Sequence, residues 1–201
     1  MVVIQAVKRM KSGGRSNAGF SLLENLIALI VVSVGLLTAA GLQGVAKRAT
    51  YDALQRTTAA LLAHDIFERM RTNSAALGGY LPPADIGGGS LGLTPALDCK
   101  IAANNCSPGQ IANFDLWEWE QALDGAAEQR AGSQTGGLIE PTACVSGPVG
   151  GGQGLYTVSI AWRGITELPN PPADNCGAGS GKYGASDGHR RVMVMNTFIT
   201  G

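Results

Sequence analysis

Two glycine-rich motifs contain residue types that could do chemistry. Residues 88–92, with the sequence GGSLG, match the G-x-S-x-G pattern around a nucleophilic serine, and His189 follows downstream. That chemistry requires a strand that enters a strained turn and a helix that leaves it. Prolines at 82, 83 and 95 flank the motif, so the match is expected by chance in a glycine-rich loop. Gly181-Lys182 lacks the first glycine and the Ser/Thr of a phosphate loop. We therefore predict no catalytic residue and no enzyme.

Glu24 is a second candidate because of where it lies. It is the only charged residue in the apolar segment from Phe20 to Ala46. An ionised carboxylate inside a membrane costs a few kcal/mol, so an acid in such a segment is a functional candidate by default. A buried charge of this kind is tolerated only when it is paired. Glu24 is therefore predicted to have a partner.

The four cysteines are the third set, and all follow the apolar segment. They are Cys99, Cys106, Cys144 and Cys176. An even count in an oxidising compartment favours disulfides, and four cysteines allow three connectivities. We favour Cys99–Cys106, which closes a small loop, and Cys144–Cys176, which ties the flanks of a strand predicted at 155–163.

A zinc site is the alternative use of these cysteines. No pair has C-x-x-C spacing, and the only histidines, His64 and His189, have no metal register with them. We therefore expect disulfides, no metal site and no cofactor.

The apolar segment 20–46 is long enough to cross a membrane. At about 1.5 Å per residue it spans a hydrocarbon core of about 30 Å as one helix. A globular core helix rarely runs this long without a polar face. Four basic residues and no acid precede the segment, which makes residues 1–19 a +4 leader: Lys8, Arg9, Lys11 and Arg15. Only Lys47 and Arg48 follow it directly, so the positive-inside rule places the N-terminus in the cytoplasm and the rest outside.

The chain after the leader has 11 basic and 15 acidic side chains, a net charge of −4. A mildly acidic body has no electrostatic footprint for nucleic acid, so we expect no nucleic-acid partner. Gly19 lies before the apolar segment, whereas a secretory signal has its small residues after the h-region. Thr38-Ala39-Ala40 is the alternative cleavage position of that second kind. The h-region would then be longer than the usual 7–15 residues or so.

Residues 18–24, AGFSLLE, resemble the class III leader of type IV prepilins and of type II secretion pseudopilins. The resemblance covers residues 15–45 and includes leader charge, small residue, aromatic residue and buried acid. It implies cleavage between Gly19 and Phe20 by the prepilin peptidase and N-methylation of Phe20. It also implies that Glu24 meets the N-terminal ammonium of a neighbouring subunit. Gly41 is a departure, because major pilins often have a helix-distorting proline there.

The elements that follow predict an α+β fold. An apolar stripe at three- and four-residue steps predicts that the helix continues from 47 to 77, so one helix covers 20–77. Its first half would lie in the membrane and its amphipathic half would pack on a globular head, residues 78–201. The stripe consists of Tyr51, Leu54, Leu61, Leu62, Ile66, Met70 and Leu77. A free-standing coiled coil is the alternative, but heptads do not persist.

The head is predicted to hold a short helix and a small antiparallel sheet. Asp115 and Glu118 fit a capping box, from which a helix would run to about Gln129 and bury Leu116, Trp119 and Leu123. Residues 155–163 and 190–200 alternate as strands, with Tyr156, Val158, Ile160 and Trp162 on one face. We expect this sheet, with disulfide-tied loops, to pack on the long helix.

Part of the head narrows the resemblance to minor pilins of the PilV type. Cys144, the strand LYTVSIAWR, Cys176-Gly177 and the closing RRVMVMNTFI carry it. The resemblance implies a structural subunit that primes and caps pilus assembly with other minor pilins and pilus subunits. It also implies a single-pass protein of the bacterial inner membrane, with its head in the periplasm until it enters the pilus. The alternatives are a minor pseudopilin of type II secretion and a membrane-anchored periplasmic binding protein in which Glu24 is incidental.

Overall fold

The computed structural model describes residues 21–126, 128–131, 133–134 and 136–200. The chain divides into two units, residues 1–46 and 47–201, which we describe separately. Helix α1 (Leu22–Thr72) runs through the end of the first unit and the beginning of the second. The leader and the bond between Gly19 and Phe20 lie outside the described residues.

The α-helix predicted to reach residue 77 ends at Thr72. A 3-10 helix, η1 (Ser74–Tyr80), follows it after Asn73, which has a non-helical backbone (φ −122°, ψ 48°). The buried Asn73 amide donates to the carbonyl of Pro108 at 2.8 Å and to the Tyr80 hydroxyl at 3.2 Å. Asparagine side chains that form such bonds compete with helical structure, which explains the early end.

In the second unit, the face of α1 that is buried differs from the predicted apolar stripe. It consists of Gln55, Ala59, Ala63, Ile66, Phe67 and Met70. Leu54 and Leu61 were expected inside but are 59% and 65% exposed. Ala59 and Ala63, which are fully buried, instead face the head. Small side chains allow close approach of the neighbouring elements, so volume as well as hydropathy selects the buried face.

Helix α2 (Pro108–Leu123) begins eight residues before the predicted start. Ser107, not Asp115, is the N-cap, and Gln110, not Glu118, completes the capping box. Pro108 occupies the first turn, where its missing N–H costs nothing. The predicted burial of Leu116, Trp119 and Leu123 is confirmed, with exposures of 4%, 0% and 0%. The Trp119 indole donates to the carbonyl of Leu62 at 2.8 Å, which joins α2 to α1.

The main sheet is antiparallel, in the order β3-β4-β5. Strands β4 (Gly154–Arg163) and β5 (Arg190–Ile199) match the predicted strands, whereas β3 (Thr142–Ser146) was not predicted. The register pairs Ala143 with Ile160 and Val158 with Met195. The head also contains a short 3-10 helix, η2 (Ala102–Asn104), and a two-stranded ladder of β1 (Gln129–Arg130) and β2 (Ser133–Gln134).

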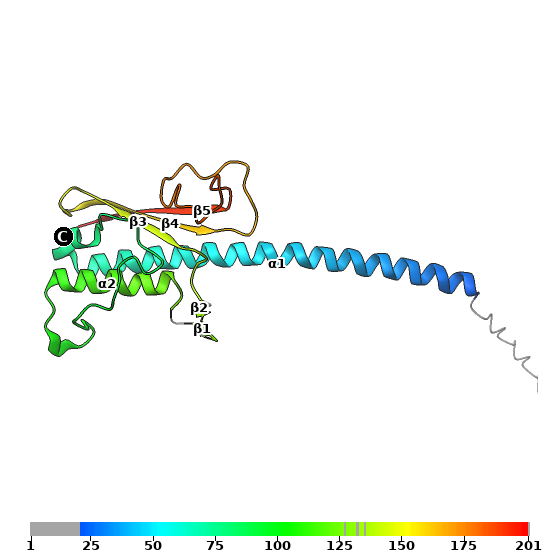
Figure 1. Ribbon diagram of the computed structural model, residues 1–201, viewed down its shortest axis with the longest axis horizontal. Coiled ribbons are helices and arrows are strands. Elements are labelled where there is room, and N and C mark those ends of the chain that lie inside the picture. Colours follow the sequence, from blue (N-terminus) through cyan, green and yellow to red (C-terminus); the bar gives the residue numbers. More distant parts are fainter. Residues whose placement is uncertain (1–20, 127, 132, 135, 201) are drawn as a thin grey trace, which may run out of the picture. The chain divides into compact units, whose positions relative to one another are not determined.

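One apolar core joins these elements. In the second unit, the sheet lies on one side of α1 and α2 lies on the other (Figure 1). The predicted inner face of β4, which comprises Tyr156, Val158, Ile160 and Trp162, is at most 2% exposed. These side chains pack with Ile66 and Met70 of α1 and with Trp119 of α2 in the same core. The α+β fold, with a long helix, a small antiparallel sheet and two disulfides, is confirmed.

Candidate functional site

Glu24 lies in the first turn of α1 and is exposed. The backbone N–H of Leu23 donates to the Ser21 hydroxyl at 3.3 Å, and the N–H of Asn25 donates to the Ser21 carbonyl at 3.1 Å. Ser21 therefore caps the helix, and Glu24 stands three residues later, where a capping box has its acid. An acid in the first turn also interacts favourably with the helix dipole. Glu24 thus has a local structural role available besides the pairing implied by the prepilin resemblance.

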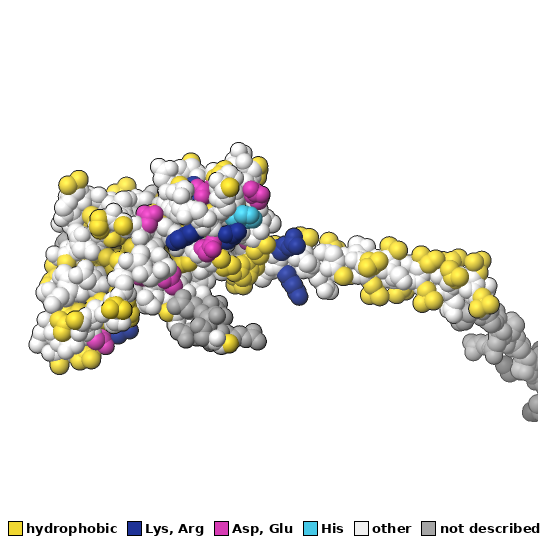
Figure 2. Space-filling model, viewed as in Figure 1, with side chains coloured by type: hydrophobic (Ala, Val, Ile, Leu, Met, Phe, Trp, Pro, Cys, Tyr) yellow, Lys and Arg dark blue, Asp and Glu magenta, His cyan; other side chains and the backbone are white. Residues whose placement is uncertain are grey.

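The segment of α1 that follows Glu24 has an apolar surface with nothing packed on it. An 18-residue window has a mean hydropathy of 2.2 and is 0% buried, and the helix is long and apolar enough to cross a membrane. Apolar side chains cover this part of α1 (Figure 2), with exposures from 53% at Ile27 to 75% at Leu37. A patch of this extent marks a surface that lipid or another protein covers.

Two hydroxyl side chains inside this segment form hydrogen bonds within the helix. The Ser33 hydroxyl donates to the carbonyl of Leu29 at 2.6 Å, and the Thr38 hydroxyl donates to that of Val34 at 2.9 Å. Each bond reaches back one helical turn, so these hydroxyls need no partner outside the helix. These bonds remove the cost of placing these two hydroxyls in hydrocarbon, and Glu24 remains the one charged group of the segment that a membrane would penalise.

An ionic network fixes α2 on α1 in the head. Arg69 contacts Asp65 at 2.9 Å, and Asp115 and Glu118 at 3.0 Å each. Asp115 also accepts a hydrogen bond from Tyr80, and Glu118 pairs with Lys100. Asp115 and Glu118, which we expected to cap a helix, are therefore ion-pair partners of Arg69 on one face of α2.

The pKa values follow from this network. Burial alone would lower the pKa of Arg69, but hydrogen bonds to Glu118 and Asp65 and the charge of Asp65 raise it above its ordinary value. Burial would raise the pKa of Glu118, but Lys100 and Arg69 hold it below its ordinary value. Burial, together with the bond to Asp115, raises the pKa of Tyr80. Arg69 and Glu118 are therefore charged, and Tyr80 is neutral, near neutral pH.

The four cysteines form the two favoured disulfides, Cys99–Cys106 and Cys144–Cys176, with Cα atoms 5.7 and 5.8 Å apart. The first closes the loop directly before Ser107, the N-cap of α2. The second joins β3 to the segment that precedes β5.

Arg190 supports the second disulfide from β5. Its side chain is buried and donates to the carbonyls of Pro172, Asp174 and Cys176. Asp174 in turn accepts a hydrogen bond from Ser159 of β4 at 2.9 Å. The outer face of β4 is covered in this way, which explains why Ser159, on the face opposite Val158 and Ile160, is only 5% exposed.

The loop of residues 87–91 has no catalytic arrangement around Ser90. The Ser90 hydroxyl donates to the Glu120 carboxylate at 2.6 Å, and the same carboxylate accepts from the N–H groups of Gly87 and Leu91. His189 instead lies with its Nδ1 3.2 Å from the carbonyl of Gly164. Glu120 is fully buried, so its role is to hold this glycine-rich loop on α2.

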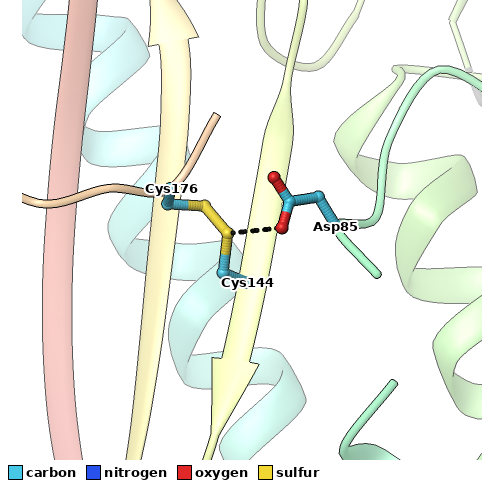
Figure 3. A group of neighbouring side chains, drawn as sticks. All are labelled: Asp85, Cys144 and Cys176. Atoms are coloured by element: carbon cyan, nitrogen blue, oxygen red, sulfur yellow. Dashed lines mark hydrogen bonds between the residues drawn. A yellow bond between two sulfur atoms is a disulfide. The ribbon is translucent and has the colours of Figure 1, made fainter. Parts of the chain in front are cut away.

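Asp85, Cys144 and Cys176 form one cluster of chemistry-bearing side chains (Figure 3). A carboxylate oxygen and the two sulfurs all lie within 4.8 Å of one another. Both sulfurs are committed to a disulfide, so thiolate ligands for a metal would exist only after reduction. No sequence pattern indicates Asp85, because it stands in a loop and meets Cys144 only through the fold.

Comparison with known families gives two adjacent matches. Residues 14–40 match the prokaryotic N-terminal methylation motif, and residues 41–117 match a family model described as type IV pilin Tt1218. Searches of curated proteins and of solved structures gave no match. The family matches cover the apolar segment, α1 and most of α2.

Proposed function

We propose that this chain, which carries a prepilin methylation motif and a type IV pilin domain, is a minor pilin that helps prime and cap assembly of a type IV pilus. The motif and the domain support the coarser statement that it is a pilin- or pseudopilin-type subunit. Such a motif implies processing by prepilin peptidase and assembly with other pilins. The apolar helix and the motif together fit a single-pass, membrane-anchored pilin.

The observation that carries the proposal is the bare apolar helix with its single acid. Every described residue from 21 to 46 is exposed, and Glu24 is the only charge among them. In the membrane precursor, lipid covers this surface. In an assembly, the same surface packs against the apolar helices of other subunits, and Glu24 pairs with an N-terminal ammonium at the start of the bundle.

The processing step creates that ammonium. Cleavage between Gly19 and Phe20 removes the +4 leader and leaves a new N-terminus four residues before Glu24. Removal of the leader also removes the cationic segment that holds the N-terminus on the cytoplasmic side. The head, with its two disulfides, then resides in the periplasm, an oxidising compartment in which such bonds persist.

Replacement of Glu24 tests the assembly role. Glu24→Leu removes a charge from the membrane segment, so insertion and processing should match those of the wild type. The unpaired ammonium that remains in an assembly should cost about 3–5 kcal/mol, the usual loss for half of a buried pair. We expect a stable, processed protein that no longer co-purifies with other minor pilins and that reduces surface piliation.

Glu24→Gln is the matched control for the helix cap. Its side chain retains the length and the hydrogen-bonding oxygen that a capping box uses, but it lacks the charge. If pairing is the function, Glu24→Gln fails in assembly like Glu24→Leu. Normal co-purification and piliation in Glu24→Gln would assign Glu24 to the cap instead. Loss of type II secretion with normal piliation would favour the pseudopilin alternative.

A further inference from the structure

Asp85 lies against the disulfide that ties β3 to the segment before β5. Its Oδ1 is 3.3 Å from Sγ of Cys144 (Figure 3). We propose that the Asp85 carboxylate guards the Cys144–Cys176 disulfide against attack by thiolates, by repelling the anion that must reach the Cys144 sulfur. The proposal concerns the stability of the disulfide and does not depend on the pilin function.

The backbone places Asp85 beside this sulfur. Ile86 and Ala143 form a two-way antiparallel bridge, in which the N–H of Ile86 donates to the Ala143 carbonyl at 2.8 Å and the N–H of Ala143 donates to the Ile86 carbonyl at 2.7 Å. In the chain, Asp85 directly precedes Ile86 and Cys144 directly follows Ala143. Their proximity therefore follows from main-chain hydrogen bonds, and a change of the Asp85 side chain leaves these bonds in place.

The two sulfurs differ in accessibility. Cys176 is 5% exposed, and its Sγ lies 3.3 Å from the carbonyl oxygen of Ser159 and 3.6 Å from that of Thr142. Cys144 is only partly buried. A reagent from solvent therefore reaches the Cys144 sulfur, which is the one that Asp85 contacts.

Exchange at Cys144 proceeds in two displacements. A thiolate bonds to the Cys144 sulfur, the Cys144–Cys176 bond breaks, and Cys176 leaves as a thiolate that takes up a proton. A second thiolate attacks the reagent sulfur of the mixed disulfide, which releases Cys144 and forms the oxidised reagent. Two thiols supply the two electrons. Arg190 donates to the carbonyl of Cys176 at 3.0 Å, so a cation near the leaving residue favours the first step.

Asp85 opposes this first step by like-charge repulsion. The attacking thiolate and the carboxylate must come within a few ångströms of each other at the surface. For two unit charges about 4 Å apart in water, the repulsion corresponds to a rate reduction of roughly fivefold, and it increases where protein excludes water. Because the effect is electrostatic, it must depend on the charge of the reagent.

The test measures reduction of the full-length, oxidised protein in neutral detergent by three small thiols. Their thiolate forms differ in charge: mercaptoethanesulfonate is doubly negative, 2-mercaptoethanol is singly negative, and cysteamine is zwitterionic. Alkylation at timed intervals, followed by peptide mass mapping, gives the rate for each disulfide. Asp85→Asn should accelerate reduction of Cys144–Cys176 by about three- to tenfold with 2-mercaptoethanol, more with mercaptoethanesulfonate and least with cysteamine. Asp85→Lys should enlarge the differences in acceleration between the three thiols.

The second disulfide and a second acid provide controls. Reduction of Cys99–Cys106 in the same molecules should be unchanged by Asp85→Asn. Asp98→Asn, which removes an acid next to Cys99, should leave Cys144–Cys176 unchanged. Equal acceleration of Cys144–Cys176 by all three thiols would show that the substitution merely opens the loop, and no acceleration would show that Asp85 has no guarding role. Either result overturns the proposal.

Discussion

At the residue scale, single polar side chains decide how the elements of the head dock. Arg69 of α1 holds two acids of α2, and its side chain is 28% exposed, so the contact is only partly screened by water. We choose Glu118 to test this network, because it contacts both Arg69 and Lys100. Its function here is visible only in the structure, since an acid on a helix surface is most often solvated.

The pH dependence of stability should report Glu118. Its pKa in the folded protein lies below the ordinary value of 4.5. A lowered pKa means that the charged form stabilises the fold fully above that ordinary value, and that the contribution is lost as pH falls through the folded-state pKa. Glu118→Gln should cost about 1–2 kcal/mol at pH 7, as expected for a charged hydrogen bond. Thermal unfolding at several pH values measures both effects.

The Glu118→Gln protein should also lose stability less steeply than the wild type as pH falls below 4.5, the ordinary pKa of a glutamate side chain. Glu68→Gln is the matched control, because Glu68 pairs with Arg71 on the same helix surface and is 62% exposed. Exposed pairs contribute little, so this variant should unfold like the wild type at pH 7. Equal acid sensitivity of Glu118→Gln and the wild type would contradict the role given to Glu118.

At the element scale, α2 shows how a loop composition can hide a helix start. Ser107 and Gln110 have the spacing of a capping box, and Pro108 is suited to the first turn. The glycines, prolines and asparagines of residues 78–110 nevertheless predict a loop, and the Asp115–Glu118 pair has the same spacing as a capping box. The apolar periodicity of Leu116, Trp119 and Leu123 could not decide between the two starts, because it lies after both.

Replacement of the cap tests the observed start. The Ser107 hydroxyl accepts from the N–H of Gln110, and the Gln110 side chain accepts from the N–H of Ser107. Ser107→Ala should destabilise the head by about 1 kcal/mol, and Ser107→Asp should retain most of the stability because aspartate also caps helices. Denaturant unfolding measures both. A stable Ser107→Ala protein would show that α2 does not depend on this cap.

Strong patterns predicted their elements, and weak ones did not. Strands β4 and β5 are ten residues each and alternate clearly, so they were predicted from the sequence. Strand β3 has five residues, of which Ala143 and Val145 face the core, and its small side chains give little contrast. The apolar pattern of α1 could not show which face the head covers, because Ala59 and Ala63 are selected by close packing. Asp85 could not be found, because only the fold brings it to Cys144.

At the scale of the whole molecule, the chain combines two units with opposite surfaces. The described part of the first unit exposes apolar side chains throughout, whereas the second unit buries an apolar core and is tied by two disulfides. This combination requires an apolar environment for one unit and suits an oxidising aqueous compartment for the other. A membrane-anchored pilin-type subunit meets both requirements, and the motif at residues 14–40 supports this account.

The N-terminus of the protein extracted from membranes tests the central claim most directly. Intact mass and N-terminal sequencing should give a chain that begins at N-methylated Phe20, without the +4 leader. Gly19→Val, which enlarges the residue before the cleaved bond, should remain in the membrane with its leader attached. A mature chain that begins at Gly41 would show that a secretory signal peptidase removes the apolar segment. That result, or a wild-type chain that keeps residues 1–19, would contradict the account of a processed pilin-type subunit.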